Sequence, residues 1–389
     1  MQNGNREVVI VEAVRTPVGR GHEEKGYYKN VHPSNLLSKV FSEVVERAGI
    51  DGAEVEDVIT GCVQQFGEQG FNIGRNAWLE AGLPMETPAT TIDRQCGSAQ
   101  QAVNFAAAQI GAGVLDCAIG SGVEHMGHIS FADGMQVMSE HGAPFSAQLL
   151  ERYNLVPQGL SAEMIADQWE IPRSELDELA VRSHALAHQA TEEGRFEREI
   201  VPFAVNGDTY VTDQGIRPGT DIEKLAALTP AFKEDGKITA GNSSQISDGA
   251  AAVLLMERGK AEALGLRPRA RILDQVTVGV DPVIMLTGPI PATRKLLERN
   301  GMTMDDIDLV EINEAFAPVV AAWQRELKPD MDRVNVNGGA MALGHPLGST
   351  GARLLTTLLH ELERADKQVG LVTMCCGGGL GTGTLIERV

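Results

Sequence analysis

Three short segments of the sequence carry side chains that could act together in acyl transfer. Residues 93–98 (DRQCGS) place Cys96 just before a predicted helix. Residues 338–346 (GGAMALGHP) place His345 in a glycine-rich loop, and residues 374–379 (MCCGGG) place Cys375 before a run of glycines. A nucleophilic thiol, a base that ionises it and a second thiol that moves protons can transfer an acyl chain between thioesters. The three segments therefore predict an acyl-transfer site.

An internal repeat predicts how these segments come together. Residues 46–50 (ERAGI) resemble residues 298–302 (ERNGM), so position 298 corresponds to position 46. The same offset places the helix predicted after Cys96 on residues 349–364, which follow the His345 loop. A pseudo-twofold axis would bring both helix N-termini to the centre. Because helix N-termini favour negative charge, we expect a lowered pKa for the Cys96 thiol.

Each copy of the repeat alternates predicted strands and helices, which is typical of mainly parallel sheets covered by helices. The first copy takes residues 1–123 and 243–268, and the second takes residues 269–389. Between them lies an insert, residues 124–242, with amphipathic helical stretches and turns. Inserts of this size on an α/β core usually form a lid or a binding surface, so we expect this one to contact the substrate.

Charge and composition exclude several classes of protein. The 389 residues carry a formal net charge of −20, which argues against binding to nucleic acid or to an anionic membrane. A polyanionic ligand would need a local cluster of Lys and Arg. No apolar run is long enough to cross a bilayer, and residues 1–6 are too short and polar for a signal or transit peptide. The five cysteines lack the spacing of a disulfide framework, so we expect free thiols and a cytoplasmic protein.

Other thiols and imidazoles have simpler interpretations. Cys62 and Cys117 lie in apolar, strand-like segments, where a buried cysteine usually acts as a small core residue. Strand alternation turns Cys376 to the opposite face from its neighbour, which favours a structural role for it too. His184 and His188 have the i, i+4 spacing of a metal pair, but no HExxH motif or third ligand accompanies them. We therefore predict no metal site.

Longer motifs around these residues resemble those of the thiolase family from end to end of the chain. The segments are DRQCGSAQQ at 93–101, NEAFA at 313–317, NGGAMALGHPLGSTG at 337–351, CCGGGLG at 375–381, GNSSQISDGA at 241–250, GCVQQFGEQGF at 61–71 and GVEHMGH at 122–128. They are similar to segments of the bacterial degradative branch, the 3-ketoacyl-CoA thiolases of β-oxidation.

The resemblance implies an α/β thiolase fold of five layers, αβαβα, built from two duplicated βαβαβαββ halves and a loop domain. It implies that Cys96 is the nucleophile, that His345 takes its proton, and that Cys375 protonates the leaving carbanion and deprotonates incoming CoA. Asn313 would orient a water that forms one oxyanion hole with His345. The backbone N–H groups of Cys96 and Gly377 would form the second. Substrate or CoA contacts are implied for Ser244, Arg217 and Phe316.

The reaction implied by the resemblance is CoA-dependent cleavage of a 3-ketoacyl-CoA to acetyl-CoA and a shortened acyl-CoA. CoA would be a co-substrate, with no tightly bound cofactor. The resemblance also implies self-association as a dimer or a dimer of dimers, and it allows a hydratase or dehydrogenase subunit as a further partner. Neither nucleic acid nor a membrane is expected as a partner.

One departure from the family pattern bears on the direction of the reaction. Biosynthetic acetoacetyl-CoA enzymes typically carry a His-Met pair before a loop-domain glycine, where residues 156–159 of this chain read VPQG. That difference weakens the short-chain biosynthetic interpretation, which stays open because equilibrium and substrate supply set the direction. A third hypothesis is a non-catalytic acyl-CoA-binding subunit. The intact Cys96, His345, Cys375 and Asn313 argue against it.

Overall fold

The computed structural model describes residues 6–389. Residues 1–5 were assigned to the first copy and to the polar N-terminal segment, and they lie outside the described part. The first copy contains β1 (Val8–Arg15), β2 (Gly19–Arg20), α1 (Pro33–Ala48), β3 (Asp57–Gly61), α2 (Ile73–Glu80), β4 (Ala89–Ile92), α3 (Ser98–Gly111), β5 (Cys117–His125), β8 (Ser247–Glu257) and α9 (Arg258–Ala263). The second copy contains β9 (Ala270–Gly279), α10 (Pro289–Asn300), β10 (Leu309–Ile312), α11 (Ala317–Leu327), α12 (Ala340–Leu343), α13 (Thr350–Arg364), β11 (Val369–Cys376) and β12 (Leu380–Arg388).

The repeat predicted from the sequence is confirmed by the positions of these elements. The first residues of β10, α13 and β11 follow those of β3, α3 and β5 by one and the same interval, which is the offset found in the sequence. Equivalent helices also share their boundary signals. α1 and α10 both start with a proline and both end before a glycine with positive φ, at Gly49 (69°) and Gly301 (63°). The copies differ at β4. In the first copy β4 pairs with β3, whereas in the second copy the same side of β10 has only a single β-bridge, between Val310 and Val334.

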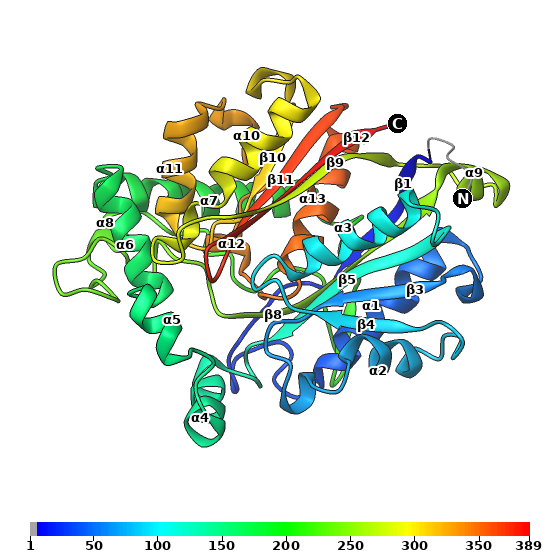
Figure 1. Cartoon of the computed structure of the whole chain (residues 1–389), viewed down its shortest axis with the longest axis horizontal. Coiled ribbons are helices and arrows are strands. Elements are labelled where there is room, and N and C mark those ends of the chain that lie inside the picture. The colour runs from blue at the N-terminus through cyan, green and yellow to red at the C-terminus, as the bar shows by residue number, and fades with distance from the viewer. Residues whose placement is uncertain (1–5) are drawn as a thin grey trace.

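The insert forms a group of helices beside the second copy, with α4 and α5 projecting from the body (Figure 1). Its elements are α4 (Phe131–His141), α5 (Ala147–Arg152), α6 (Gln158–Gln168), α7 (Arg173–Glu192), β6 (Phe203–Val205), β7 (Asp208–Tyr210) and α8 (Ile222–Ala226). α6 and α7 pack against α11, and α7 also packs against α12, which leads into the His345 loop. The insert therefore lies against the segments that carry the predicted site.

The strands follow the order β10-β11-β12-β9-β1-β8-β5-β3-β4, with β2 paired to β8. Among the strands of residues 6–389, only the pairs β3–β4, β3–β5 and β10–β11 are parallel, so the expectation of mainly parallel sheets is wrong. In the second copy the reason is local, because three glycines join β11 to β12 and a connection that short permits only antiparallel pairing. The two copies meet where β1 and β9 pair over two residue pairs, Val9 with Arg271 and Ile10 with Ala270.

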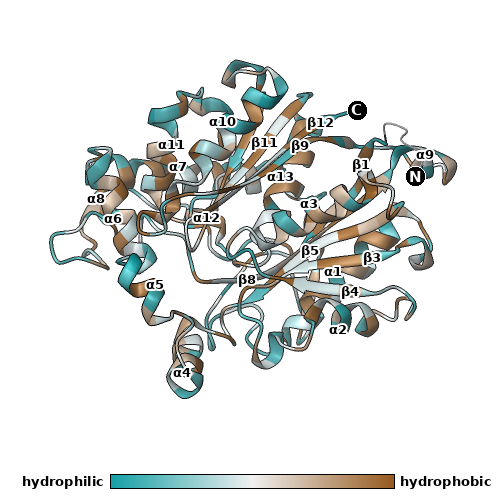
Figure 2. Cartoon of the chain, viewed as in Figure 1, coloured by the Kyte–Doolittle hydropathy of each residue, from teal (hydrophilic) through white to brown (hydrophobic). Residues whose placement is uncertain are grey.

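The layers follow from which strands each helix touches. α3 and α13 touch each other and strands of both copies, so they lie between the two halves of the sheet (Figure 1). α1 and α2 cover the outer face of the first copy, and α10 and α11 cover that of the second. This arrangement gives the predicted five layers. Three buried apolar clusters fill the spaces between the layers, and the strands that bound them are largely hydrophobic (Figure 2).

The hydropathy of the helices bears on membrane insertion. Within residues 6–389, no helix combines the length and the apolar character that crossing a membrane requires.

Candidate active site

The two central helices begin side by side, as the repeat predicts. A Cβ on Gly351, in the first turn of α13, would collide with Gln100 in the first turn of α3. A Cβ on Gly61 would likewise meet Ser98, Ala99 and the carbonyl oxygen of Gly348. Glycine is needed at both positions because the backbones approach so closely. The loop before α3 carries Cys96 and the loop before α13 carries His345, so this contact brings their segments together.

Cys96 lies at a tight turn directly before α3. Gln95 has a φ of 50°, in the left-handed region, and its side chain bonds to Asp93. The hydroxyl of Ser98 accepts a hydrogen bond from the N–H of Arg94 (2.9 Å) and donates to the carbonyl of Gln95 (2.6 Å). A non-glycine residue with positive φ costs about 1 kcal/mol or more, so these bonds must hold the turn in place. The turn fixes the backbone on both sides of the thiol.

The expectation of a lowered pKa at Cys96 is wrong. The side chain is buried, and burial raises the pKa of the thiol to about 11. Hydrogen bonds from the N–H groups of Gly377 and of Cys96 itself act in the opposite direction, while the charges of Glu124 and Asp93 add to the rise. Desolvation therefore outweighs the helix N-terminus and the two amides. The Cys96 thiol is therefore protonated at neutral pH.

His345 is held through both ring nitrogens. Nδ1 lies 2.6 Å from the hydroxyl oxygen of Thr350, and Nε2 lies 3.3 Å from the side-chain nitrogen of Asn313. The hydroxyl of Thr350 donates its only proton to the carbonyl of Pro346 (2.9 Å), so it must accept from Nδ1–H. Nε2 is therefore the unprotonated nitrogen, which accepts from the Asn313 amide and can take a proton. Burial, followed by the charge of Arg353, lowers the pKa of His345 to about 3, so the ring is neutral.

Asn313 follows the last residue of β10 and is fully buried. Its backbone N–H donates to the carbonyl of Thr373 on β11 (3.1 Å), which fixes the residue at the end of two parallel strands. The side-chain oxygen Oδ1 is buried and has no hydrogen-bond partner within residues 6–389. A buried amide oxygen without a partner is costly. The arrangement suits an acceptor for a polar group of the substrate or for water.

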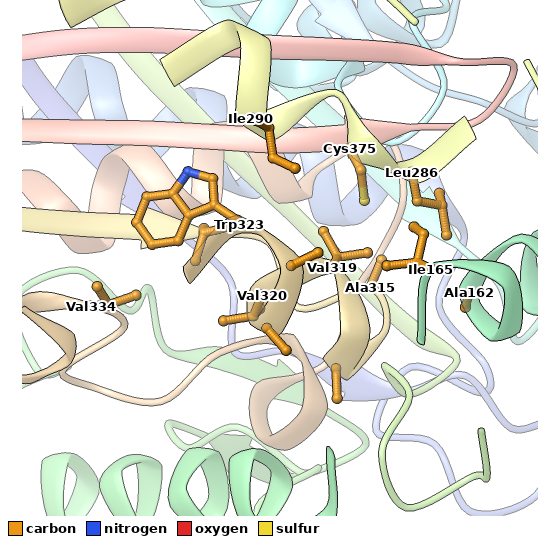
Figure 3. Packing of buried hydrophobic residues seen from close by; sticks show 14 of the residues in the cluster. Ala162, Ile165, Leu286, Ile290, Ala315, Val319, Val320, Trp323, Val334 and Cys375 are labelled. Carbon is orange, nitrogen blue, oxygen red and sulfur yellow. The ribbon is translucent and has the colours of Figure 1, made fainter. Parts of the chain in front are cut away.

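Cys375 and Cys376 point to opposite faces of β11, as strand alternation predicts. Cys375 belongs to the apolar cluster on the outer side of the sheet, and Figure 3 shows it near Leu286 and Ile290. Burial raises its pKa well above the usual thiol range, and the nearby Cys96 raises it further. Cys376 belongs to the central cluster, where its sulfur lies so close to Gly97 that a Cβ there would be 2.6 Å away. Cys376 therefore fills space beneath the nucleophile turn.

Gln158, from the departure noted in the sequence, lies against Gly377. A Cβ on Gly377 would lie 2.7 Å from the side-chain nitrogen of Gln158, at the start of α6. The next residue, Gly159, lies directly against the ring of Phe232, which meets the ring of Phe316 edge-on with centroids 6.0 Å apart. The VPQG segment noted in the sequence is therefore part of the wall around Gly377.

Ser244 and Arg217 occupy different surroundings. The N–H of Ser244 donates to the carbonyl of Ala315 (2.9 Å), which places Ser244 beside the NEAFA segment and Phe316. Arg217 is exposed in the insert, and its N–H donates to Nδ1 of His184 (3.2 Å). The structure thus brings Ser244 and Phe316 together and places Arg217 at the surface.

Two positioning residues were missed in the sequence. Thr350 lies in the quoted motif, but only the fold reveals its bond to His345. Its place at the start of a predicted helix, five residues after His345, was the available signal. Glu124 lies within β5, and its buried carboxylate accepts hydrogen bonds from the N–H groups of Val63 (2.9 Å), Gln64 (3.1 Å) and Gly348 (2.8 Å). It ties the loop after β3 to the loop before α13, contacts that no local pattern encodes.

No set of three or more His, Cys, Asp or Glu side chains in residues 6–389 is arranged to hold a metal ion.

Known proteins match nearly the whole chain. The family model described as "Thiolase, N-terminal domain" matches residues 8–259, and the one described as "Thiolase, C-terminal domain" matches residues 266–388. A steroid 3-ketoacyl-CoA thiolase of Mycobacterium tuberculosis is 46% identical over 389 residues, covering 98% of this chain and 94% of that protein. A 3-ketoacyl-CoA thiolase of Marinobacter nauticus is 44% identical, covering 99% of each chain. A crystal structure of the acetyl-CoA acetyltransferase of Bacillus anthracis matches with a TM-score of 0.90 and 40% identity, covering 100% of both chains.

Proposed function

The chain belongs to the thiolase family and is therefore a thiolytic acyltransferase, and we propose that it acts through an acyl-enzyme on Cys96. The observation that carries the proposal is the junction of α3 and α13, where the loops that hold Cys96 and His345 meet. His345 is neutral, with Nε2 available as a base, and Cys375 lies near Cys96. These are the groups that the reaction requires.

The first half-reaction cleaves the carbon–carbon bond between C2 and C3 of a 3-ketoacyl-CoA. Nε2 of His345 takes the proton of the Cys96 thiol while the sulfur attacks the C3 carbonyl. The N–H groups of Cys96 and Gly377, which already face the sulfur, stabilise the oxyanion at C3. The C2–C3 bond then breaks and leaves an enolate of acetyl-CoA, whose oxygen is stabilised by His345 and a water on Asn313. Cys375 gives its proton to C2, and acetyl-CoA leaves.

The second half-reaction transfers the shortened acyl group to CoA. The Cys375 thiolate left by the first step takes the thiol proton of incoming CoA. The CoA sulfur attacks the thioester on Cys96, and the same two N–H groups stabilise the oxyanion. When the C–S bond to Cys96 breaks, the protonated His345 returns its proton to the departing sulfur. The cycle is ping-pong, and both thiols end as they began.

We assign the insert and its neighbours to substrate binding. Residues 124–242 would form a loop domain for the CoA and acyl groups, between halves formed by residues 1–123 with 243–268 and by residues 269–389. The packing of α6 and α7 beside α11 and α12, and the place of Gln158 against Gly377, support this division. Ser244 and Phe316 would then line the path to Cys96, with Arg217 further out.

The degradative direction is favoured by the names of the relatives and by the wall formed by Gln158. Two relatives are called 3-ketoacyl-CoA thiolases, one of them for steroids, whereas the solved structure is an acetyl-CoA acetyltransferase. Biosynthetic condensation of two acetyl-CoA molecules therefore stays the second candidate. The residues of the proposed cycle are all present, which argues against a non-catalytic binding subunit.

We predict that thiolysis extends beyond the shortest substrate. With CoA present, kcat/KM should be higher for 3-ketoacyl-CoAs with longer chains than for acetoacetyl-CoA, because the apolar wall of Phe232 and Phe316 buries added methylenes, each worth up to about 0.8 kcal/mol. The measurement is a chain-length series followed by the loss of each substrate. Turnover restricted to acetoacetyl-CoA would instead favour the biosynthetic candidate, and no turnover of any member would refute the function.

We propose self-association through the edge strand β4. This strand pairs with β3 on one side only, and it leads directly into the Cys96 turn. Phe71 nearby is 96% exposed and has a φ of 54°, an unusual combination for a large apolar residue. A second copy turned by a twofold axis could pair its own β4 with this edge and cover both Phe71 rings.

We predict a dimer in solution that weakens when Phe71 becomes aspartate. Two buried carboxylates near the twofold axis would repel and lose apolar contact, so the dimer dissociation constant should rise at least about 10-fold. Sedimentation velocity over a range of concentrations measures it. Leu264→Asp changes another exposed apolar residue on a different face and should leave the dimer intact. A monomeric unsubstituted protein would overturn the proposal.

We propose a cytoplasmic location for the protein. All five cysteines are unpaired thiols, as expected in a reducing compartment.

We also propose that α4 and α5 can bind a hydratase or dehydrogenase subunit. These two helices carry no buried residue, and they expose apolar side chains that include Phe131, Met135 and Phe145. A hydratase or dehydrogenase subunit would find an apolar surface there. Cross-linking in a cytoplasmic extract of the source cell would test both points.

A further inference from the structure

One arginine in the central layer is buried with a single loose partner. Arg353 lies on α13, and only 1% of its side chain is exposed. Its Nη1 atom lies 3.4 Å from Oε2 of Glu311 on β10, which is also buried. Its Nε and Nη2 atoms are buried and have no hydrogen-bond partner in residues 6–389. Because desolvation outweighs the attraction in such a pair, Arg353 contributes little to stability, and its position calls for another explanation.

Two routes through the structure join Arg353 to the proposed base. On α13, Thr350 comes one turn before Arg353, so both lie on the same side of the helix. Thr350 is the residue whose hydroxyl bonds to Nδ1 of His345 (2.6 Å). On β10, Glu311 precedes Asn313 by two residues and faces the same side of the sheet, and Asn313 lies 3.3 Å from Nε2 of His345. The Arg353–Glu311 pair therefore closes a ring of contacts behind the imidazole.

The other charged groups near Arg353 form an ion-pair network of their own. Arg15 on β1 binds two carboxylates of the insert, Glu199 (2.6 Å) and Asp213 (2.7 Å). In residues 6–389, Arg353 is the charged group that adds to burial in lowering the pKa of His345. The electrostatic effect on the ring is thus that of a nearby positive charge.

This charge matters most when His345 carries a proton. In the proposed cycle the ring takes the proton of Cys96 and keeps it until the second half-reaction, so the acyl-enzyme contains an imidazolium. Two positive charges then lie near each other in a buried region, where their repulsion is much stronger than in water. Arg353 therefore raises the energy of the acyl-enzyme.

We propose that Arg353 is a positioning residue whose charge favours the second half-reaction, an inference that rests on the proposed function. Arg353 acts through His345. By destabilising the imidazolium, it makes Nε2 give its proton to the sulfur of Cys96 when the C–S bond to the acyl group breaks. The proton moves from Cys96 to His345 in the first half-reaction and back in the second, so the balance is unchanged. Glu311 holds the guanidinium in place.

The test measures the two half-reactions separately. Acetoacetyl-CoA alone should acetylate Cys96 and release acetyl-CoA, and CoA added afterwards should remove the acetyl group. Rapid quenching followed by the intact mass of the protein gives the rate of each step. The main variant is Arg353→Met/Glu311→Leu, because replacing both members of a buried pair by apolar residues usually leaves stability unchanged or higher.

In this double variant the rate of the second half-reaction, divided by that of the first, should fall by at least about 10-fold. A nearby charge shifts a pKa by about one unit or more, and one unit is a factor of ten in the proton equilibrium. Arg353→Gln also removes the charge but can still donate to Glu311, so it should show the same fall even if the double variant does not fold.

Two conservative variants separate charge from packing. Arg353→Lys keeps the positive charge and should keep most of the ratio. Glu311→Gln keeps an acceptor oxygen for Arg353 and leaves its charge in place, so it should not slow the second half-reaction relative to the first.

Arg267→Met is the matched control, since Arg267 is exposed at another surface and its loss removes the same charge. It should leave the ratio unchanged. A displaced His345 would slow both half-reactions alike, so equal slowing in Arg353→Gln, or an unchanged ratio, would overturn the proposal. If the unsubstituted protein gained no acetyl group from acetoacetyl-CoA, the proposed function would be refuted instead.

Discussion

Replacing Cys96 with alanine should abolish thiolysis. In the proposed cycle every acyl group passes through this sulfur, so kcat should fall by at least about 10⁴-fold, as in other enzymes that lose their nucleophile. The measurement is the disappearance of a 3-ketoacyl-CoA in the presence of CoA, together with the intact mass of the protein after incubation with the 3-ketoacyl-CoA alone. The unsubstituted enzyme should gain one acyl group, and Cys96→Ala should gain none. A variant with thiolysis near the normal rate would refute the acyl-enzyme.

Cys117→Ala is the matched control for Cys96→Ala. Cys117 is equally buried and belongs to the apolar cluster between α1 and the first half of the sheet. Loss of its thiol should lower stability by about 1 kcal/mol or somewhat more, with little change in kcat. If both variants lost activity together, unfolding and not chemistry would be the cause.

The raised pKa of Cys96 sets the pH at which the same thiol reacts with an alkylating agent. Only the thiolate is alkylated, and a thiol whose pKa is raised to about 11 is almost wholly protonated at neutral pH. Raising the pH increases the thiolate fraction until the pKa is passed, so the rate at Cys96 should climb steadily from about pH 7 to about pH 10. A plateau across that range would indicate a preformed thiolate and imidazolium, contrary to the neutral pair in the structure.

That contrast shows what sequence could and could not predict about the nucleophile. The position of Cys96 before a helix was predictable from the repeat and the surrounding residues. Its pKa was not, because the helix N-terminus is a local feature whereas burial depends on the whole fold. Gly351, Gly61 and Gly348 bring the two halves together around the thiol, and the resulting desolvation raises the pKa.

The fold was predicted in its repeat and its layers, and less well in its strand directions. A repeat with a constant offset is a property of the sequence itself, so the equivalent helices were found at the expected places. Strand direction depends on which strands become neighbours, and the Gly377–Gly379 connection between β11 and β12 makes a hairpin. Glu124 and Thr350 were missed for a similar reason. The carboxylate of Glu124 joins loops that are far apart in the sequence, and the hydroxyl of Thr350 bonds to the ring of His345 only when the loop before α13 is folded.

Replacing Cys375 with serine should lower kcat by about 10²- to 10⁴-fold, the usual contribution of a proton-transfer group. Serine has the shape of cysteine but is a far weaker acid, so it cannot protonate the enolate at C2 efficiently. The surroundings of Cys375 are apolar, with Leu286 and Ile290 close by (Figure 3). Deuterium uptake from heavy water into the methyl group of acetyl-CoA follows this proton step directly and should fall in parallel.

The neighbouring thiol gives the sharpest control. Cys376→Ser makes the same one-atom change at the next residue, on the opposite face of β11. There the side chain packs under Gly97 and beside Thr382, both of which can hydrogen-bond to a serine hydroxyl as they do to the thiol. This variant should keep kcat and deuterium uptake close to those of the unsubstituted enzyme. Equal losses in both variants would show that any polar change beneath Cys96 disturbs the nucleophile, and the proton-transfer role of Cys375 would then have to be abandoned.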